Sequence, residues 1–362
     1  MSRNKTINIG IIGAGFARST QIPGFRAAGA RVVAITSAHR EHAQAVASEF
    51  QIAHVADDWR GVIAREDVDL VSIATPPAIH MEIALAALDA GKAVLCEKPM
   101  AMSADEADLM RRSARETGHL ALIDHELRFL AGRRRMREML RGGEIGQVYH
   151  AKLLFRADWR AKPELAWDWW SSAEQGGGTL GAIGSHAVDA FRWLLATEAT
   201  HVFCQLATHI RERPDRQTGE MRAVSTDDEA NLLLRFKDTA LTRGATGAIS
   251  MSVVESGRPD HRLEIFGSRG ALRLDGDDLW RSVTGAGQWE QVEVERGELA
   301  EGMRDSEWSR GFTIFARAIT KALRVDATAI EDAATFEDGY RTQLVLDGAH
   351  RSHESGCWNE IV

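Results

Sequence analysis

Two short segments of this 362-residue chain place residues that can do chemistry directly after apolar runs. The first is Gly13-x-Gly15, which follows Ile7–Ile12 and precedes a helix-like segment. There, one glycine permits a tight turn and the other lets the backbone approach a pyrophosphate at the helix N-terminus. Two glycines alone are weak evidence, and Arg18 stands where a third is usual, so an ordinary strand-to-helix turn is the alternative. The context favours a dinucleotide site.

The second segment is Glu97-Lys98-Pro99, which follows the apolar run Ala93–Cys96. A lysine at the carboxyl end of a strand points to the region where ligands bind in open α/β sheets. Its ammonium group can hydrogen-bond a substrate hydroxyl and move a proton. A solvated surface lysine is the ordinary alternative, and the neighbouring glutamate and proline favour a functional role for Lys98.

The segment Thr36–Arg40 bears on which dinucleotide would bind. A dinucleotide site that binds NAD usually has an acid about 20 residues after the glycines, where it contacts the ribose. Here Ser37 and Arg40 stand near that position and no acid does. A hydroxyl and a cation suit the 2′-phosphate of NADP better than a carboxylate would. The sequence therefore slightly favours NADP over NAD, although Arg40 could simply begin an exposed helix.

The first third of the chain alternates short apolar runs with helical patterns, which is typical of parallel βαβ units. This alternation predicts strands at Ile7–Ile12, Arg31–Thr36, Leu70–Ala74, Ala93–Cys96 and Leu120–Ile123. It predicts helices at Glu41–Phe50 and Ile79–Ala90, and a third that begins at Ser103 with a capping box and ends at Gly118.

After Asp124 the pattern changes to alternating strands joined by polar turns, with two helices at the end. These elements predict an α+β domain with a large, mostly antiparallel open sheet, one face of which is free for a subunit contact. We expect a Rossmann domain over residues 1–124, a substrate-binding domain over 125–362, and an active site between them. The predicted strands are Val148–Phe155, His201–Ile210, Asn231–Phe236, Ala248–Val254, His261–Phe266, Ala271–Leu274 and Gln291–Val294, and the helices are Ser306–Leu323 and Ala333–Ser352.

Several motifs together resemble the glucose-fructose oxidoreductase, inositol dehydrogenase and rhizopine-catabolism (Gfo/Idh/MocA) family. The resemblance covers essentially the whole chain, and Thr-Pro-Pro-x-x-His with Glu-Lys-Pro is its most specific part. The matching stretches are Ile11–Phe16, Ala74–His80, Ala87–Lys92, Val94–Pro99, Gly176–Gly178, Gly184–Asp189 and Phe336–Gly339.

The resemblance implies roles for residues around the nucleotide. It implies that Lys98 is catalytic and that Glu97 and Pro99 shape the cofactor loop. It also implies that the cofactor is lined by Phe16, Ala17, Thr75, Pro76 and His80. By itself, a histidine at a helix start such as His80 would more often be structural.

The resemblance also points to His186 as the acid/base partner of Lys98. The family commonly has an aspartate four residues before this histidine, and here that position is Ala182. The exchange removes a carboxylate that would hold substrate or tune the imidazole. Asp189, three residues after His186, could orient the ring, or it could be an ordinary helix aspartate.

Aromatic and basic residues gather in the stretch before the three glycines. Trp159 could stack on the apolar face of a sugar, and Arg156 could bind hydroxyls or a carboxylate. Arg128, just after the last predicted Rossmann strand, is a further candidate for substrate binding. Burial of these side chains in the interface between the two predicted domains is an equally good interpretation.

Composition excludes several other classes. A formal net charge of −8 argues against a nucleic-acid partner, because phosphate binding needs a basic surface. No apolar stretch approaches a membrane span and no cleavable signal is recognised at the N-terminus, so we expect a cytoplasmic protein. The three cysteines are far apart, which predicts reduced thiols, and no metal-ligand spacing is present.

Together these features predict an NAD(P)-dependent dehydrogenase or reductase. It would transfer hydride between nicotinamide and a secondary alcohol or ketone of a sugar, cyclitol or related polyol, as a homodimer or homotetramer. Two alternatives remain open: redox-neutral glycoside cleavage or elimination with a tightly held NAD, and a non-catalytic regulator that senses the nucleotide.

Overall fold

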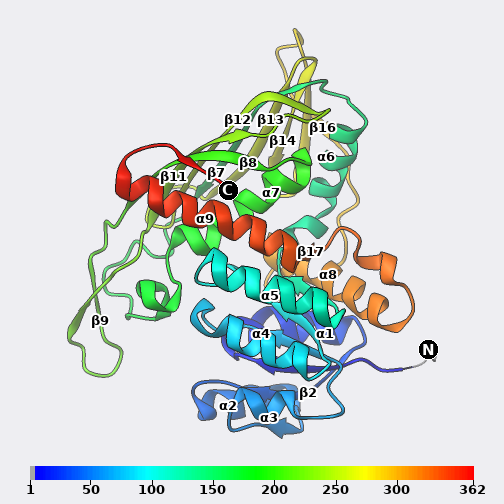
Figure 1. Ribbon diagram of the computed structural model, residues 1–362, viewed down its shortest axis with the longest axis vertical. Helices are drawn as coiled ribbons and strands as arrows, with labels where there is room; N and C mark the ends of the chain where they lie inside the picture. The colour runs from blue at the N-terminus through cyan, green and yellow to red at the C-terminus, as the bar shows by residue number, and fades with distance from the viewer. Residues whose placement is uncertain (1–4) are drawn as a thin grey trace. The chain divides into compact units, whose positions relative to one another are not determined.

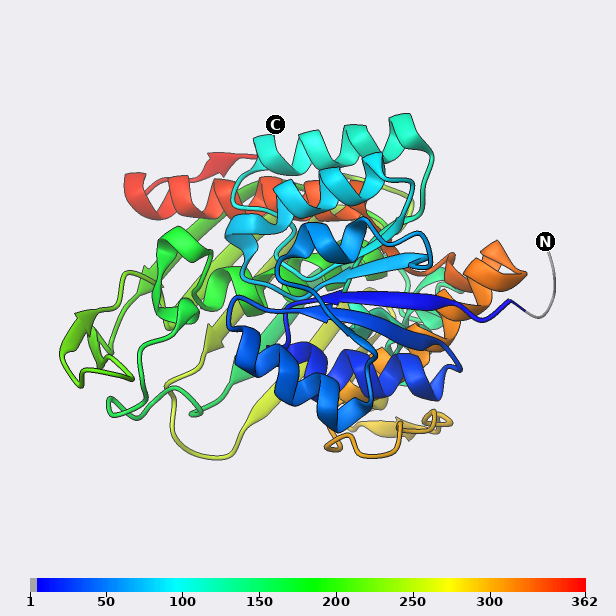
Figure 2. The same ribbon diagram turned by 90° about the horizontal axis from the view of Figure 1, so that it is seen from below.

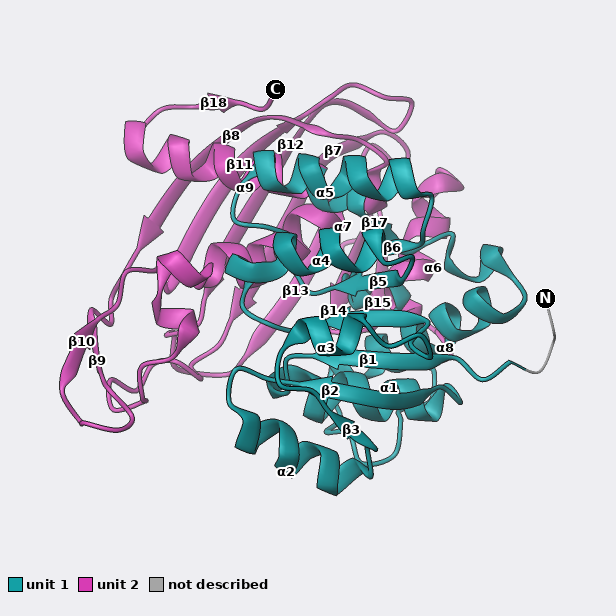
Figure 3. Cartoon of the chain, turned by 60° about the horizontal axis from the view of Figure 1, so that its bottom comes forward, with its two compact units in different colours: residues 1–130, 296–340 teal, residues 131–295, 341–362 magenta. Residues whose placement is uncertain are grey.

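The computed structural model describes residues 5–362, which divide into two compact units (Figure 3). Unit 1 runs to Leu130 and includes Arg296–Tyr340, and unit 2 comprises Ala131–Glu295 and Arg341–Val362. The structure thus places the first boundary at Leu130 rather than after residue 124, and it returns a C-terminal segment to unit 1. The prediction that no cleavable signal peptide is present rests partly on residues 1–4, and these lie outside the described residues.

Unit 1 is a Rossmann domain with one sheet in the described part of the chain (Figure 1). The strands lie in the order β17-β6-β5-β4-β1-β2-β3, and all pairs are parallel except β17 with β6. The order reverses between β1 and β4, which is the switch point where such sheets bind ligands. The bounds are β1 Asn8–Ile12, β2 Arg31–Thr36, β3 His54–Val55, β4 Leu70–Ile73, β5 Ala93–Cys96, β6 Ala121–Ile123 and β17 Ala334–Thr335.

Helices cover both faces of this sheet (Figure 2), and the described residues form a separate apolar core on each face. One core lies under α1, α2 and α8, and the other lies under α3, α4 and α5. Because both faces are buried, the strands read as continuous apolar runs. The helices are α1 Ile22–Ala27, α2 Arg40–Phe50, α3 Trp59–Ile63, α4 His80–Asp89, α5 Ala104–Thr117 and α8 Glu307–Arg324, with short turns η1 Ala17–Gln21, η2 Pro77–Ile79, η3 Glu126–Phe129 and η7 Ala327–Ile330.

The ends of α5 follow the predicted signals. The hydroxyl of Ser103 accepts a hydrogen bond from the backbone N–H of Glu106 at 3.3 Å, and the Glu106 carboxylate accepts one from Met102 N–H at 3.0 Å. Gly118 ends the helix with a φ of 67°, a left-handed conformation that glycine adopts without strain. Local side-chain chemistry therefore sets both ends.

Unit 2 is built on a large mixed sheet in the order β16-β15-β14-β13-β7-β12-β11-β8-β18. All its pairs are antiparallel except β7 with β12, so the mostly antiparallel sheet predicted from the sequence is confirmed. The strands are β7 Val148–Arg156, β8 Ala199–Ala207, β11 Glu229–Phe236, β12 Thr242–Ser252, β13 Asp260–Gly267, β14 Gly270–Asp275, β15 Asp278–Val283, β16 Glu290–Val292 and β18 Asn359–Glu360.

Three helices pack on one face of this sheet through a single apolar core. They are α6 Ala131–Arg141, α7 Ser185–Leu195 and the unit 2 part of α9 Phe336–Ser355. A hairpin, β9 Glu212–Pro214 with β10 Met221–Ala223, extends from unit 2 as a separate two-stranded sheet. The sequence prediction missed β15, the hairpin and the two-residue strands. The strands of the hairpin and the two-residue strands are too short to carry periodicity.

The described residues include no helix long and apolar enough to cross a membrane. Two of the three free cysteines, Cys96 and Cys204, are buried, and Cys357 is exposed.

Candidate active site

The glycine turn after β1 is shaped by a close approach to β4. Gly13 has a φ of +104°, and its N–H donates to the carbonyl of Thr36 at 2.9 Å. A Cβ atom at Gly13 would lie 2.2 Å from the carbonyl oxygen of Ala74, so a larger residue does not fit. A Cβ at Gly15 would meet nothing within 4 Å. The turn therefore leaves an open cradle beside Gly15, at the switch point of the sheet.

The residues that follow the turn differ in what they can offer a nucleotide. Phe16 is 38% exposed, whereas Ala17 is fully buried. Arg18, in place of the third glycine, points to Glu49 on α2 at 2.7 Å. These residues are compatible with the predicted dinucleotide, because neither Phe16 nor Arg18 is drawn into the core.

The end of β2 carries the two residues that favoured NADP. Ser37 is half-buried and Arg40 begins α2. The Arg40 guanidinium forms an ion pair with Asp57. The Asp57 side chain is 91% exposed, so water screens this pair and it holds Arg40 only weakly. A cation is therefore present at this end of the site, together with a carboxylate that the sequence interpretation overlooked.

His80 joins the loops that follow β4 and β5. Its ring is fully buried, with Nδ1 3.1 Å from the carbonyl oxygen of Pro99 and Nε2 2.8 Å from that of Thr75. Burial lowers the pKa of this imidazole. Each ring nitrogen faces a backbone carbonyl, one from each loop, so His80 contacts both loops, and a neutral ring donates to one of the two carbonyls. Pro76 belongs to the loop that follows β4, directly before η2.

These loops bring Lys98 to the carboxyl edge of the sheet. Lys98 is half-buried directly after β5, between the buried residues Glu97 and Pro99. Because β1, β4 and β5 are neighbours, Gly13, Thr75 and Lys98 follow three adjacent strands at one edge. The hydroxyl of Thr75 is buried and has no hydrogen-bond partner among the described residues, so it is available to a ligand. The open cradle and this hydroxyl fit a nicotinamide dinucleotide.

Arg128, a predicted substrate residue, has a structural partner in unit 1. It is 4% exposed, and it donates to the carboxylate of Asp338 at 3.1 Å and to the carbonyl of Asp332 at 3.4 Å. These bonds tie η3 to the C-terminal segment that returns to unit 1. They account for the burial of a charged side chain, which has to be paired.

In unit 2, the triple glycine leads into the helix that carries His186. Gly178 has a φ of +104°, and a Cβ atom there would lie 2.5 Å from Oδ1 of Asp227. The other oxygen of Asp227 accepts from the N–H of Leu180 at 2.8 Å, at the start of the turn η6 Leu180–Gly184. Burial raises the pKa of Asp227 to about 7. The sequence interpretation missed Asp227, since nothing local to it predicts that it contacts residues 178–180.

The predicted acid/base histidine and its neighbours are buried. His186 is 5% exposed and Asp189 is 2% exposed, both on α7, and Ala182 in η6 is 2% exposed. An alanine therefore fills the position where the family commonly has an aspartate. Lys98 belongs to unit 1 and His186 to unit 2.

The predicted substrate residues of unit 2 lie at the end of β7 and in the loop beyond it. Arg156 donates to Glu255 at 2.5 Å and remains partly exposed. Trp159 is 47% exposed and packs edge-to-face on Trp170, with ring centroids 5.0 Å apart. The exposed Trp159 therefore rests on a second tryptophan.

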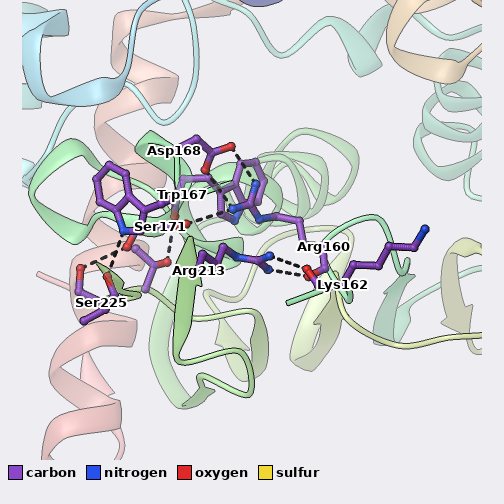
Figure 4. Close-up of polar contacts among 10 residues, drawn as sticks. Arg160, Lys162, Trp167, Asp168, Ser171, Arg213 and Ser225 are labelled. Carbon is purple, nitrogen blue, oxygen red and sulfur yellow. Dashed lines mark hydrogen bonds and ion pairs between the residues drawn. The ribbon is translucent and has the colours of Figure 1, made fainter. Parts of the chain in front are cut away.

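Two buried arginines hold this loop (Figure 4). Arg160 donates to both carboxylate oxygens of Asp168, at 3.1 and 3.0 Å, and to the hydroxyl of Ser171. Arg213, from the hairpin strand β9, donates to the carbonyls of Lys162 at 2.8 Å and Arg160 at 2.6 Å. Arg213 is only 2% exposed, and the sequence interpretation did not identify it because the bonds it makes span about fifty residues.

The doubly wound sheet and the glycine cradle at its switch point define an NAD-binding oxidoreductase. Residues 7–125 match the model described as "Oxidoreductase family, NAD-binding Rossmann fold", and residues 133–273 match that of the GFO/IDH/MocA C-terminal domain. The chain belongs to the Gfo/Idh/MocA family and is of the NAD-dependent dehydrogenase type.

Individual relatives agree with this assignment. An uncharacterized oxidoreductase of Synechocystis is 33% identical over 79% of this chain and 76% of its own length. Levoglucosan dehydrogenase of Pseudarthrobacter phenanthrenivorans is 30% identical over 74% of this chain and 73% of its own. A solved levoglucosan dehydrogenase in complex with NADH and L-sorbose is similar with a TM-score of 0.87 and 25% identity, covering 99% of both chains.

Proposed function

We propose that this protein transfers hydride between a nicotinamide dinucleotide and a secondary alcohol or ketone of a sugar, cyclitol or related polyol. The observation that carries the proposal is the position of Lys98, at the same sheet edge as the Gly13 turn and the buried Thr75 hydroxyl. The name of levoglucosan dehydrogenase, and its complex with NADH and L-sorbose, support a sugar-like substrate.

The residues of the site divide into those that bind and those that move protons. The Gly13–Gly15 cradle, Phe16, Ala17 and Thr75 would hold the nucleotide, which supplies the hydride acceptor or donor. Lys98 would hydrogen-bond the substrate oxygen and exchange its proton. His186 would serve as the second acid/base group, with Asp189 beside it on α7.

Substrate contacts in unit 2 would come from Arg156 and Trp159. Trp159 offers an exposed indole that suits the apolar face of a sugar ring, and its contact with Trp170 fixes its orientation. Arg156 is partly exposed and could exchange its bond with Glu255 for one with a hydroxyl. Arg128 is the weakest candidate, because Asp338 already pairs with it.

We further propose a slight preference for NADP over NAD. The absence of an acid at Ser37 and the presence of Arg40 support it, while the ion pair of Arg40 with Asp57 reduces it. Two solved structures of levoglucosan dehydrogenase to which this chain is similar contain NADH.

We also propose that the protein is a homodimer or homotetramer that uses the open face of the unit 2 sheet. Leu233 on β11 is 48% exposed, and it pairs with Phe203 on β8 and Ala248 on β12. Light scattering at micromolar concentration checks the oligomeric state.

The decisive experiment replaces Lys98 with alanine and follows reduced nicotinamide by absorbance over a polyol panel. We expect kcat to fall by about 100-fold or more, with nucleotide affinity by calorimetry nearly unchanged. Lys5→Ala is the matched control, because Lys5 is exposed and pairs only with Asp69 among the described residues. Retention of more than about a tenth of kcat would remove Lys98 from the mechanism.

The same panel separates the alternatives. Product formation without net change in added nucleotide would indicate redox-neutral glycoside chemistry, and nucleotide binding without turnover of any substrate would indicate a regulator.

A further inference from the structure

Two carboxylic acids are buried side by side beneath the loop that carries Lys98. Glu97 follows β5 and Asp124 follows β6, and the last residues of these strands, Cys96 and Ile123, pair in register. Glu97 is 8% exposed and Asp124 is fully buried. Only one of these two acids, Glu97, belongs to a motif identified from the sequence.

A glutamine ties the two acids together. Nε2 of Gln21 donates to Oε1 of Glu97 at 2.9 Å and to Oδ2 of Asp124 at 3.2 Å. The other end of the amide is fixed, since Oε1 of Gln21 accepts from the hydroxyl of Ser72 at 2.9 Å. The serine thereby orients the glutamine so that its N–H groups face the acids.

Both acids accept from the same amide nitrogen, so their carboxyl groups lie close together, and a side-chain hydrogen bond with the other acid raises the pKa of Asp124 and lowers that of Glu97. Ionised carboxylates only accept hydrogen bonds, so a bond between two of them requires one proton. Oδ1 of Asp124 is buried and receives no hydrogen bond from a donor among the described residues. That oxygen is therefore suited to carry the proton and to donate it.

The surrounding charges favour the proton on Asp124 rather than on Glu97. Burial raises the pKa of both acids, and for Asp124 the charges of Glu97 and Glu126 raise it further. For Glu97, the positive charge of Lys98 and a hydrogen bond from the backbone of Lys98 both lower the pKa. Burial and the charges of Glu97 and Asp124 raise the pKa of the Cys96 thiol, so it stays neutral.

We propose that Asp124 is a neutral carboxylic acid that donates its proton to Glu97 and is a positioning residue for Lys98. The hydrogen bonds from Asp124 and Gln21 fix the Glu97 carboxylate, and this carboxylate holds the backbone of Lys98. One proton is thus a structural part of the cofactor loop. The link to turnover rests on the function proposed above, whereas the existence of the proton does not.

Infrared difference spectroscopy of the whole protein tests the proton directly. At neutral pH the wild type should show the carbonyl stretch of buried protonated carboxyl groups, and Asp124→Asn should lose a component of the band that Asp227→Asn retains. Asp89→Asn is the matched control, because Asp89 is exposed, and it should keep the band. A wild type without the band, or a band lost in Glu97→Gln but retained in Asp124→Asn, would overturn the assignment.

The pH dependence of unfolding gives a second test. Above the ordinary aspartate pKa, the folded protein holds a proton that the unfolded chain has released. The folding equilibrium constant should therefore fall about tenfold per pH unit as the pH rises towards the raised pKa. Asp124→Asn supplies an amide donor in place of the acid, so the variant should fold. Its folding equilibrium constant should lack the part of this pH dependence that comes from Asp124. A slope identical to that of wild type, or an unfolded Asp124→Asn, contradicts the proposal.

Turnover tests the positioning role. Asp124→Ala removes the donor to Glu97 and should lower kcat by about tenfold or more and shift the pH–rate profile, whereas Asp124→Asn should restore both to within about threefold. Unchanged profiles in both variants would overturn the positioning role. If Lys98→Ala is itself fully active, the proposed function fails while the infrared band remains.

Discussion

Replacement of Arg213 by methionine should destabilise unit 2 and release the loop that carries Trp159. The two bonds of Arg213 to the carbonyls of Lys162 and Arg160 are 2.8 and 2.6 Å long, and the side chain is 2% exposed. Hydrogen bonds from charged donors contribute about 1.5–3 kcal/mol each, so the two amount to roughly 3–6 kcal/mol. Burial lowers the pKa of Arg213, which shows that its charge is desolvated at a cost in free energy. Methionine carries no charge and removes this desolvation cost, which offsets part of the loss. We expect a net loss of about 2–4 kcal/mol.

Urea unfolding followed by tryptophan fluorescence measures this loss, because Trp167, Trp169 and Trp170 lie in the affected loop. Limited proteolysis should show faster cleavage between residues 157 and 179. Arg213→Lys should recover little of the stability, since one ammonium group lacks the planar fork that reaches two carbonyls. Arg216→Met, at an exposed position of the same hairpin, is the control. A change of less than about 0.5 kcal/mol in the free energy of unfolding of Arg213→Met would refute the stabilising role of the Arg213 hydrogen bonds.

Three other predictions concern cofactor choice, catalysis and pH. Arg40→Ala should lower the preference for NADP over NAD and Asp57→Asn should raise it, whereas equal KM values for both cofactors in the wild type contradict the proposal. His186→Ala should lower kcat/KM by at least about 100-fold, and Ala182→Asp should shift a limb of the pH–rate profile; activity within a few-fold of wild type in His186→Ala makes the histidine structural. Because Asp227 has a pKa raised to about 7 by burial, its contribution to stability should decline as the pH rises from about 4 to about 7, and urea unfolding of Asp227→Asn should lack this decline.

Features that depend on neighbouring residues were predictable from the sequence. The Rossmann strands, the capped ends of α5 and the glycine turn all follow from spacing and side-chain type within a few residues. Most strands of the unit 2 sheet were also identified, because an alternation of apolar and polar residues indicates a strand with one buried face. The positions of Gly13, Thr75 and Lys98 at one sheet edge then follow from the rule that parallel strands end together.

The tertiary structure alone decided the partners of the buried charges. Gln21 and Asp124 are 103 residues apart, and Arg128 and Asp338 are 210 apart. Hydrophobic periodicity shows which face of an element is buried, but it does not show which distant group meets a polar atom there. The segment Arg296–Tyr340 likewise returned to unit 1 because α8 packs on α1 and η3 and β17 pairs with β6.

The sequence by itself thus determined the class of fold, the glycine turn and the lysine loop, because strands, helices and turns carry signals within a few residues. The tertiary structure decided that His80 contacts two loops, that Arg213 hydrogen-bonds the loop that carries Trp159, and that Glu97 is buried next to Asp124. Each of these is a buried polar group. Such a group needs a hydrogen-bond partner, and the partner comes from whichever segment the fold places beside it.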